Sequence, residues 1–173
     1  MIKVCFYGAE STGKSTMARH VAEAYSTRFV PEVAREFVSS NDFSVDDIIK
    51  IGHAQTTRIA NLETLANRIL ICDTDLITTQ IYSKHYLGIV PEVLYELESQ
   101  VHYDRYFLFD IDVPWVADGL RDLQNQREEM HSVFKNELEA RGIDFILVRG
   151  DWEERYQIIV SEIDRLLHES KEF

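Results

Sequence analysis

Residues 8–15 of this sequence read GAESTGKS and directly follow a short apolar run, and they are the first stretch suited to chemistry. Glycines at both ends of such a loop let successive backbone N–H groups turn inward toward phosphate oxygens, where a side chain would obstruct. The lysine supplies a mobile charge for the β- and γ-phosphates of a nucleotide, and the serine hydroxyl completes a Mg²⁺ shell. The pattern predicts that ATP and Mg²⁺ bind at Gly8, Glu10, Ser11, Thr12, Gly13, Lys14, Ser15 and Thr16, with Lys14 also acting in catalysis.

Acidic residues that follow apolar runs are the next candidates, because an open parallel sheet binds its ligands beyond the carboxyl ends of its strands. Asp73 ends an apolar run and is the expected Mg²⁺ ligand alongside the loop serine. Glu32 follows a shorter run, where a carboxylate can accept a proton from a bound substrate hydroxyl, and it is the first choice for general base. Asp75 is the competing base or an acceptor for a ribose hydroxyl, whereas binding and structural roles are equally open for Asp110 and Asp112.

Two arginines six residues apart, Arg121 and Arg127, lie in a segment where apolar residues no longer recur at regular spacing. A guanidinium binds phosphate oxygens bidentately, and a closing lid excludes water from the reaction. We therefore expect a short lid over residues 118–130 in which both arginines bind ATP and Arg121 acts in catalysis; ordinary surface arginines are the alternative. Arg35, three residues after Glu32, is expected to orient that carboxylate or to contact substrate, with a salt bridge at a helix start as the alternative.

Both tryptophans, Trp115 and Trp152, follow apolar runs late in the chain and are candidates for substrate binding. Two aromatic faces can hold a flat heterocycle between them, and a cationic ring would gain about 1 to 2 kcal/mol from the cation–π interaction. Roles in the core compete with this interpretation, more strongly for Trp152, because it also begins the apolar stripe of the last expected helix.

Short apolar runs alternate with longer segments of helical period, which is typical of a parallel sheet with crossover helices. The runs at residues 2–7, 28–30, 69–72, 106–109 and 145–148 predict five strands. Apolar residues at helical spacing over 14–25, 45–65 and 152–167 predict helices that cover the sheet. The fold class is therefore α/β, a five-stranded parallel sheet flanked by helices, and the length of 173 residues predicts one domain over residues 1–173.

Composition excludes several classes of protein. Most proteins that bind nucleic acid or anionic membranes are basic, whereas this chain has a net charge of −12, so neither partner is expected. No apolar run approaches the roughly 20 residues of a membrane-spanning helix, and the amino terminus has no signal-peptide pattern, so a cytoplasmic protein is expected. Cys5 and Cys72 lie in apolar runs and are expected to be buried free thiols.

Several stretches together resemble the nicotinamide riboside kinase domain of bacterial NadR regulators, over nearly the whole chain. The stretches are residues 8–16, Glu32 with Arg35 and Glu36, residues 52–55, residues 73–75 with 78–80, and residues 114–121, of which the last is the most discriminating. The resemblance implies a P-loop kinase of the nucleoside and nucleotide kinase type. It implies transfer of the ATP γ-phosphate, with Mg²⁺, to the ribose 5′-hydroxyl of nicotinamide riboside, giving nicotinamide mononucleotide.

The same resemblance implies that Trp115 and Trp152 hold the pyridinium ring and that Arg121 and Arg127 belong to the lid. A small-molecule nucleoside is thus the expected partner, and a homo-oligomer is left open. Two alternatives remain: a kinase for another nucleoside or deoxynucleoside, and a non-catalytic module that binds nucleotides for regulation. The strand-end acids Glu32, Asp73 and Asp75 favour catalysis, because a binding module has no need of the full set.

Overall fold

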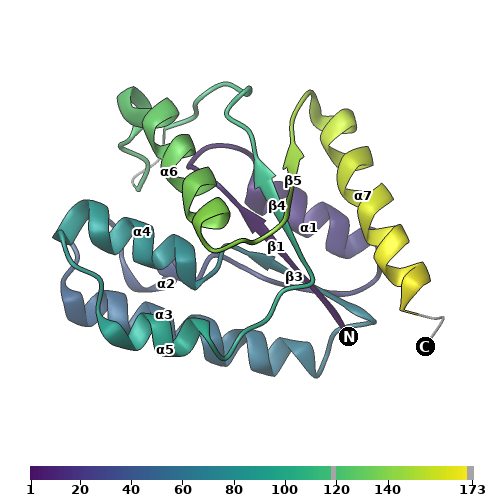
Figure 1. Ribbon diagram of the computed structural model, residues 1–173, viewed down its shortest axis with the longest axis horizontal. Helices are drawn as coiled ribbons and strands as arrows, with labels where there is room; N and C mark the ends of the chain where they lie inside the picture. The colour runs from purple at the N-terminus through teal and green to yellow at the C-terminus, as the bar shows by residue number, and fades with distance from the viewer. Residues whose placement is uncertain (118–119, 171–173) are drawn as a thin grey trace.

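The computed structural model describes residues 1–117 and 120–170, and it is built on a five-stranded sheet in the order β2-β3-β1-β4-β5 (Figure 1). All four strand pairs are parallel. The strands are β1 (Ile2–Tyr7), β2 (Arg28–Val30), β3 (Ile69–Asp73), β4 (Arg105–Phe109) and β5 (Phe145–Val148). The five predicted strands are therefore confirmed, with β3 and β4 each one residue longer than their apolar runs.

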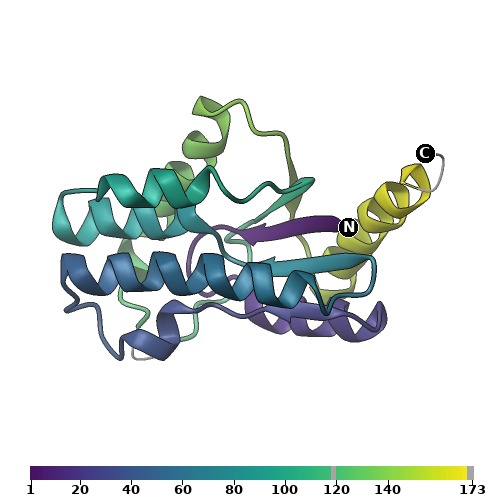
Figure 2. The same cartoon turned by 90° about the horizontal axis from the view of Figure 1, so that it is seen from below.

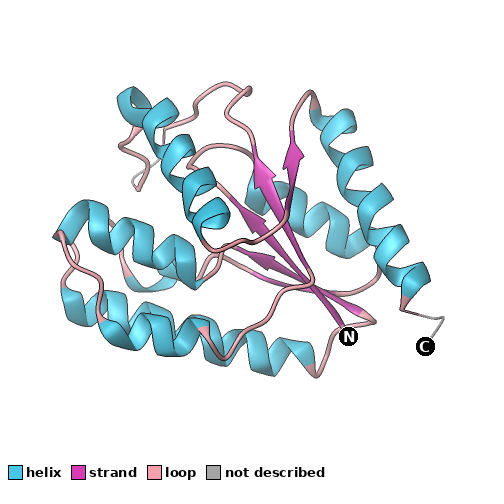
Figure 3. Cartoon of the chain, in the orientation of Figure 1, coloured by secondary structure: helices cyan, strands magenta, loops and turns pink. Residues whose placement is uncertain are grey.

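The helices follow the strands in alternation, as Figure 3 shows. They are α1 (Lys14–Ala24), α2 (Ala34–Phe37), α3 (Val45–Glu63), α4 (Leu76–Leu87), α5 (Glu92–Glu98), α6 (Arg127–Ala140) and α7 (Trp152–Glu169), with one 3₁₀ turn at Gln124–Gln126. The predicted helices over 14–25, 45–65 and 152–167 correspond to α1, α3 and α7. Of the lid expected over 118–130, residues 118–119 lie outside the described part, and the remainder includes the 3₁₀ turn and the start of α6.

Alternation along the strands decides which helices cover which face of the sheet, because successive side chains of a strand point to opposite faces. On one face, Phe6 of β1 and Phe107 of β4 pack against α1 and α7. On the other, Tyr7 and Leu108 pack against α4 and α6, and β2 and β3 pack against α3. Helix α5 packs on α3 and α4, outside that layer (Figure 2). Both faces of the sheet are buried, as a parallel sheet requires.

Side-chain capping boxes fix the starts of two helices, α3 and α7. Ser44 and Asp47 form a capping box at the start of α3, and Asp151 and Glu154 form one at the start of α7. Each box satisfies backbone N–H groups that the first turn leaves without partners and stabilises its helix by about 1 kcal/mol. The caps fix where α3 and α7 begin, and so the direction in which each leaves its loop.

The two cysteines are both buried and free, as predicted, and they lie side by side on β1 and β3. Within the described ranges, every helix is too short or too polar to cross a membrane.

Candidate functional site

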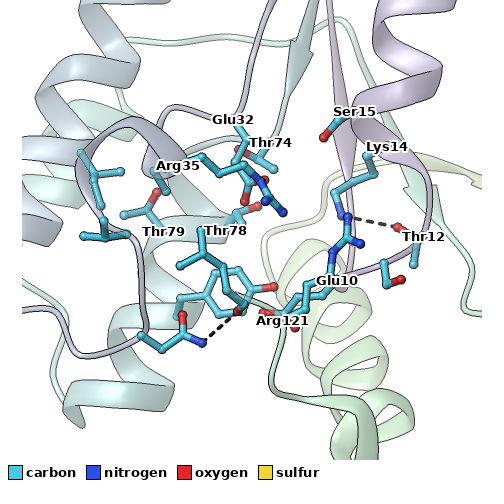
Figure 4. Close-up of a pocket in the computed structure, with 18 of the residues that line it drawn as sticks. Glu10, Thr12, Lys14, Ser15, Glu32, Arg35, Thr74, Thr78, Thr79 and Arg121 are labelled. Atoms are coloured by element: carbon cyan, nitrogen blue, oxygen red, sulfur yellow. Dashed lines mark hydrogen bonds and ion pairs between the residues drawn. The ribbon is translucent and has the colours of Figure 1, made fainter. Parts of the chain in front are cut away.

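One cavity opens at the carboxyl ends of β1, β2 and β3, and we call it the main cavity (Figure 4). It brings together many of the residues expected at the site: the loop of residues 8–16, Glu32, Arg35 and Arg121. The residues that line it include Glu10, Thr12, Lys14, Ser15, Glu32, Arg35, Asn41, Phe43, Gln55, Thr74, Thr78, Thr79, Tyr82, Tyr86 and Arg121. Segments far apart in the sequence thus meet at the edge where a parallel sheet binds its ligands.

The loop between β1 and α1 has the backbone that phosphate binding needs. Gly8 has φ 132° and approaches β4 so closely that a Cβ there would lie 2.9 Å from the Phe109 carbonyl oxygen. Ser11 and Gly13 are left-handed, with φ 57° and 85°. Gly13 is the N-cap of α1 and offers no side chain to the first N–H groups of that helix. These N–H groups therefore remain available to an anion at the positive end of the helix.

Lys14 folds back over the loop. Its Nζ donates to the Ala9 carbonyl oxygen at 2.7 Å and to Thr12 Oγ1 at 3.4 Å, as Figure 4 shows for Thr12. Burial lowers the pKa of Lys14, whereas the charges of Asp73 and Glu32 raise it. The ammonium group is thus held beside the loop amides and partly desolvated, where its attraction for phosphate oxygens is stronger than in water.

Asp73, at the end of β3, fits the expected role beside a metal ion. It is 1% exposed, and within the described residues neither of its carboxylate oxygens has a hydrogen-bond partner. Burial and the charge of Glu32 raise the pKa of Asp73, the charge of Lys14 and the nearby Ser15 hydroxyl lower it, and the resulting pKa is about 6. A buried carboxylate without partners is costly unless a cation joins it. One carboxylate and one hydroxyl, with phosphate oxygens and water completing the shell, suit Mg²⁺.

Glu32 and Arg35 form an ion pair at the wall of the main cavity opposite Lys14 (Figure 4). Arg35 Nε donates to Glu32 Oε2 at 2.8 Å. Arg35 belongs to the short helix α2, which follows β2 directly, so the pair sits where β2 ends. The contact is compatible with both alternatives for Arg35, because a salt bridge at the start of α2 also orients the Glu32 carboxylate. The carboxylate remains at the cavity wall, within reach of a bound ligand.

Asp75 lies in a different setting from Glu32. It is the N-cap of α4, and its Oδ1 accepts hydrogen bonds at 2.8 Å from both the backbone N–H and the hydroxyl of Thr78. Its Oδ2 accepts a hydrogen bond from the Tyr106 hydroxyl at 2.9 Å. The side chain is 1% exposed, and burial raises its pKa to about 6, whereas its hydrogen bonds lower it. Both oxygens are therefore used to hold α4 and β4 together beneath the cavity.

Arg121 lines the main cavity together with Arg35, whereas Arg127 and Arg155 support the loop. Arg121 lines the cavity, and its Nη1 donates to the Val116 carbonyl oxygen at 2.9 Å. Arg127, at the start of α6, donates to the carbonyl oxygens of Ser11 at 3.0 Å and Val113 at 2.5 Å. These hydrogen bonds of Arg127 thus support the backbone of the phosphate loop.

Arg155 is a supporting residue that sequence reasoning missed. It is 2% exposed, it donates to the Thr12 carbonyl oxygen at 2.8 Å, and it pairs with Asp112. Of the roles left open for Asp112, the ion pair with Arg155 supports the structural one. Arg155 lies four residues before Ile159 and eight before Ile163, the other buried residues of α7, so a charged residue at the spacing of the buried face was the available signal. Only the fold shows that it fastens the loop to β4 and α7.

The two tryptophans line different cavities. Trp152 lines a second cavity on the other side of the loop, together with Thr16, Phe109 and Pro114. Its ring lies 4.0 Å from where a Cβ of Gly13 would be. Trp115 instead lines a small cavity with Arg127, whose guanidinium Cζ lies over the Trp115 ring at 5.8 Å from the ring centroid. The structure therefore does not bring the two rings to one ligand in this conformation.

Phe43, Tyr82 and Tyr86 are the aromatic residues of the main cavity, and sequence reasoning did not single them out. Tyr82 and Tyr86 are four residues apart on α4, and their rings stack with centroids 6.3 Å apart. The available signal was that spacing, which places both rings on the same face of the helix as Thr78 and Thr79.

Comparisons with known proteins agree with this geometry. Residues 3–155 match the model of a family described as AAA domain. The chain is 31% identical over 179 residues to the trifunctional NAD biosynthesis/regulator protein NadR of Escherichia coli (strain K12), in an alignment that covers 97% of this chain and 43% of that protein. The chain thus spans less than half the length of this relative.

Two solved structures show the same fold. One is a NadR protein in complex with NR, at 22% identity and a TM-score of 0.82, covering 95% of this chain and 51% of that chain. The other is a deoxyadenosine kinase from M. mycoides with products bound, at 12% identity and a TM-score of 0.68, covering 95% of this chain and 100% of that one. The predicted fold class, that of P-loop nucleoside and nucleotide kinases, is confirmed.

Proposed function

Because the chain belongs to the AAA domain family, and because its phosphate loop faces a carboxylate across one cavity, we propose that it is an ATP-dependent nucleoside kinase. The observation that carries this proposal is the placement of Lys14 and Glu32 on opposite walls of the main cavity (Figure 4). A phosphate held by Lys14 and a hydroxyl held at Glu32 would meet between them. Holding two reactants in that arrangement is the largest part of catalysis of phosphoryl transfer.

The proposed acceptor is nicotinamide riboside, which would be converted to nicotinamide mononucleotide. Three observations support it: the relative from Escherichia coli takes part in NAD biosynthesis, the related NadR structure holds NR, and the main cavity has an aromatic wall. The positive charge of the pyridinium ring also suits a chain with a net charge of −12.

In the proposed mechanism, Glu32 accepts the proton of the ribose 5′-hydroxyl as its oxygen attacks the γ-phosphorus of ATP. The bond from that phosphorus to the bridging oxygen breaks, and ADP leaves with the electron pair. Lys14 and Arg121 stabilise the negative charge on the transferring group, and Arg35 keeps the Glu32 carboxylate oriented. Ser15 and Asp73 would hold Mg²⁺, whose charge would neutralise phosphate oxygens and orient them.

The donor and the acceptor occupy opposite sides of the loop in this proposal. The phosphates lie on the loop, the acceptor fills the main cavity, and the base of ATP extends into the second cavity, against Trp152. Trp152 is thereby assigned to the nucleotide, whereas Phe43, Tyr82 and Tyr86 are assigned to the acceptor.

Replacing Trp152 with Ala tests this division. We expect the KM for ATP to rise about fivefold to tenfold, because a stacking contact contributes about 1 to 1.5 kcal/mol, with the KM for the acceptor unchanged. Steady-state kinetics with each substrate varied in turn measure both values. The matched variant Tyr82→Ala is expected to show the reverse pattern. If Trp152→Ala raised only the KM for the acceptor, Trp152 would instead be assigned to binding the pyridinium ring.

The proposed function is tested by ADP release from ATP with each of several acceptors at equal concentration. Nicotinamide riboside is expected to give the highest kcat/KM, ahead of uridine, adenosine and deoxyadenosine. Turnover with a deoxynucleoside but none with nicotinamide riboside would contradict the proposed acceptor and leave the kinase reaction standing. ATP binding without turnover of any acceptor would support the non-catalytic regulatory module instead.

A further inference from the structure

Glu10 is the acidic side chain of the phosphate loop, and its carboxylate lies in the main cavity between the loop and the aromatic wall (Figure 4). Its Oε2 is fully buried and has no hydrogen-bond partner among the described residues. The phosphate loop needs only the backbone at this position, so phosphate binding does not explain a carboxylate there. The Leu123 amide hydrogen-bonds to the carboxylate, but within the described part of the chain the buried Oε2 lacks a partner of its own, which is unfavourable beside an anionic phosphate unless a ligand compensates it.

The surroundings of Glu10 are aromatic and acidic. Tyr82 and Tyr86 of α4 line the same cavity, and the Tyr86 hydroxyl donates a hydrogen bond to the Asp122 carboxylate. Aromatic faces and carboxylates together attract a flat cation more strongly than a flat neutral ring. Glu10 and the two tyrosines thus bring negative charge and aromatic faces to the same cavity that Lys14 lines.

We propose that Glu10 makes the enzyme select acceptors whose base carries a positive charge, by placing a carboxylate beside that base in the main cavity. The inference rests on the proposed kinase function and adds to it the residue that distinguishes a cationic from a neutral base. A cation offsets the cost of keeping the Glu10 carboxylate ionised in its buried position. A neutral base of the same shape leaves that cost in place.

Charges around Glu10 make this selectivity depend on pH. Burial and the charge of Asp122 raise the pKa of Glu10, the Leu123 amide and Lys14 lower it, and the resulting pKa is about 7. The titratable and charged groups that face Glu10 from the surrounding elements are Lys14, Glu32, Tyr82, Tyr86, Arg121, Asp122 and Arg127. Below about pH 7 the carboxylate is protonated and neutral, so a cationic base gains little from it. Above that pH the carboxylate is ionised, and the preference for the cation is fully developed.

The test compares nicotinamide riboside with its 1,4-dihydro form, which has nearly the same shape but a neutral ring. The quantity measured is the ratio of kcat/KM for the cationic acceptor to kcat/KM for the neutral one, between pH 5.5 and pH 8.5. Titrations common to both reactions, such as that of Asp73, cancel in this ratio. We expect the ratio to rise about tenfold with pH, centred near pH 7, in the unmodified protein.

Glu10→Gln keeps the size and polarity of the side chain and removes its charge. In this variant the ratio is expected to fall about tenfold at pH 8 and to be independent of pH. Glu139→Gln on α6, which removes an equal charge from a side chain 53% exposed and paired with Lys135, is the matched control and is expected to leave the ratio unchanged.

The outcomes separate the two proposals. If the unmodified protein phosphorylates neither acceptor but does phosphorylate another nucleoside, the proposed acceptor is wrong and the inference about Glu10 fails with it, whereas the kinase function stands. If it phosphorylates both and Glu10→Gln lowers both values of kcat/KM equally, Glu10 contacts a group that the acceptors share, such as the ribose hydroxyls, and the inference is overturned. A ratio that is the same in the unmodified protein and in Glu10→Gln at every pH overturns it as well.

Discussion

Lys14→Ala is expected to lower kcat about a thousandfold or more, because the Lys14 ammonium stabilises the charge that develops on the transferring phosphoryl group. The ammonium of Lys14 already rests on the loop through the Ala9 carbonyl oxygen, 2.7 Å away, so it needs little reorganisation to reach a phosphate. Steady-state turnover with saturating ATP and acceptor measures the effect.

The fold is expected to survive this substitution. Burial lowers the pKa of Lys14, which means that its charge costs stability where it lies, so removing it should leave the melting temperature unchanged or slightly raised. Lys135→Ala is the matched control, since it removes an equal charge from an exposed position on α6. Turnover in Lys14→Ala within a few-fold of the unmodified protein, with the fold intact, would contradict the mechanism.

Glu32→Gln is expected to lower kcat about a hundredfold to ten-thousandfold, with a much smaller change in the KM for the acceptor. Gln keeps a hydrogen-bond acceptor for the Arg35 Nε–H and can still hold the acceptor hydroxyl, but it cannot take its proton. Separate measurement of kcat and KM distinguishes this loss from a loss of binding.

Asp75→Asn is the comparison that decides between the two carboxylates. Asn is also a good N-cap, and its amide can keep contacts with both Thr78 and Tyr106, so α4 should persist at a cost of about 1 to 2 kcal/mol. We expect near-normal kcat with a melting temperature lowered by several degrees. Near-normal kcat in Glu32→Gln and a large loss in Asp75→Asn would reverse the assignment and make Asp75 the base.

The elements of the fold could be predicted because their signals are local. The strands and the helices α1, α3 and α7 follow from the spacing of apolar residues over a few turns or pleats. The phosphate loop was found in the same way, since a strand, two glycines and a helix start occupy one continuous stretch. The position of Glu32 and Asp73 at the site edge of the sheet could be predicted because the carboxyl ends of all parallel strands meet at one edge.

The parts that sequence reasoning missed depend on the paths of loops and on the direction of single side chains. Asp75 is only two residues from Asp73, yet its side chain turns beneath the cavity to cap α4. The segment between β4 and α6 takes Trp115 toward Arg127 and away from Trp152. No periodicity encodes these directions, because each is decided by contacts between residues far apart in the chain.

The net charge of −12 is distributed to suit an anionic donor and a cationic acceptor. Positive groups gather at the phosphate loop, where Lys14, Arg121 and the start of α1 face one end of the main cavity. Carboxylates accompany the aromatic wall, where Glu10 lines the same cavity and Asp122 accepts a hydrogen bond from Tyr86. The excess of acidic residues thus does not oppose ATP binding at the loop itself.

The central claim is that the chain transfers the γ-phosphate of ATP to the 5′-hydroxyl of nicotinamide riboside. Phosphorus NMR of the products formed from ATP, Mg²⁺ and nicotinamide riboside tests it most directly, because coupling to the two 5′-protons identifies the phosphorylated carbon. We predict one phosphomonoester signal, split by two protons and equal in amount to the ADP formed. ADP accompanied only by inorganic phosphate, or a phosphate coupled to a single ribose proton, would contradict it.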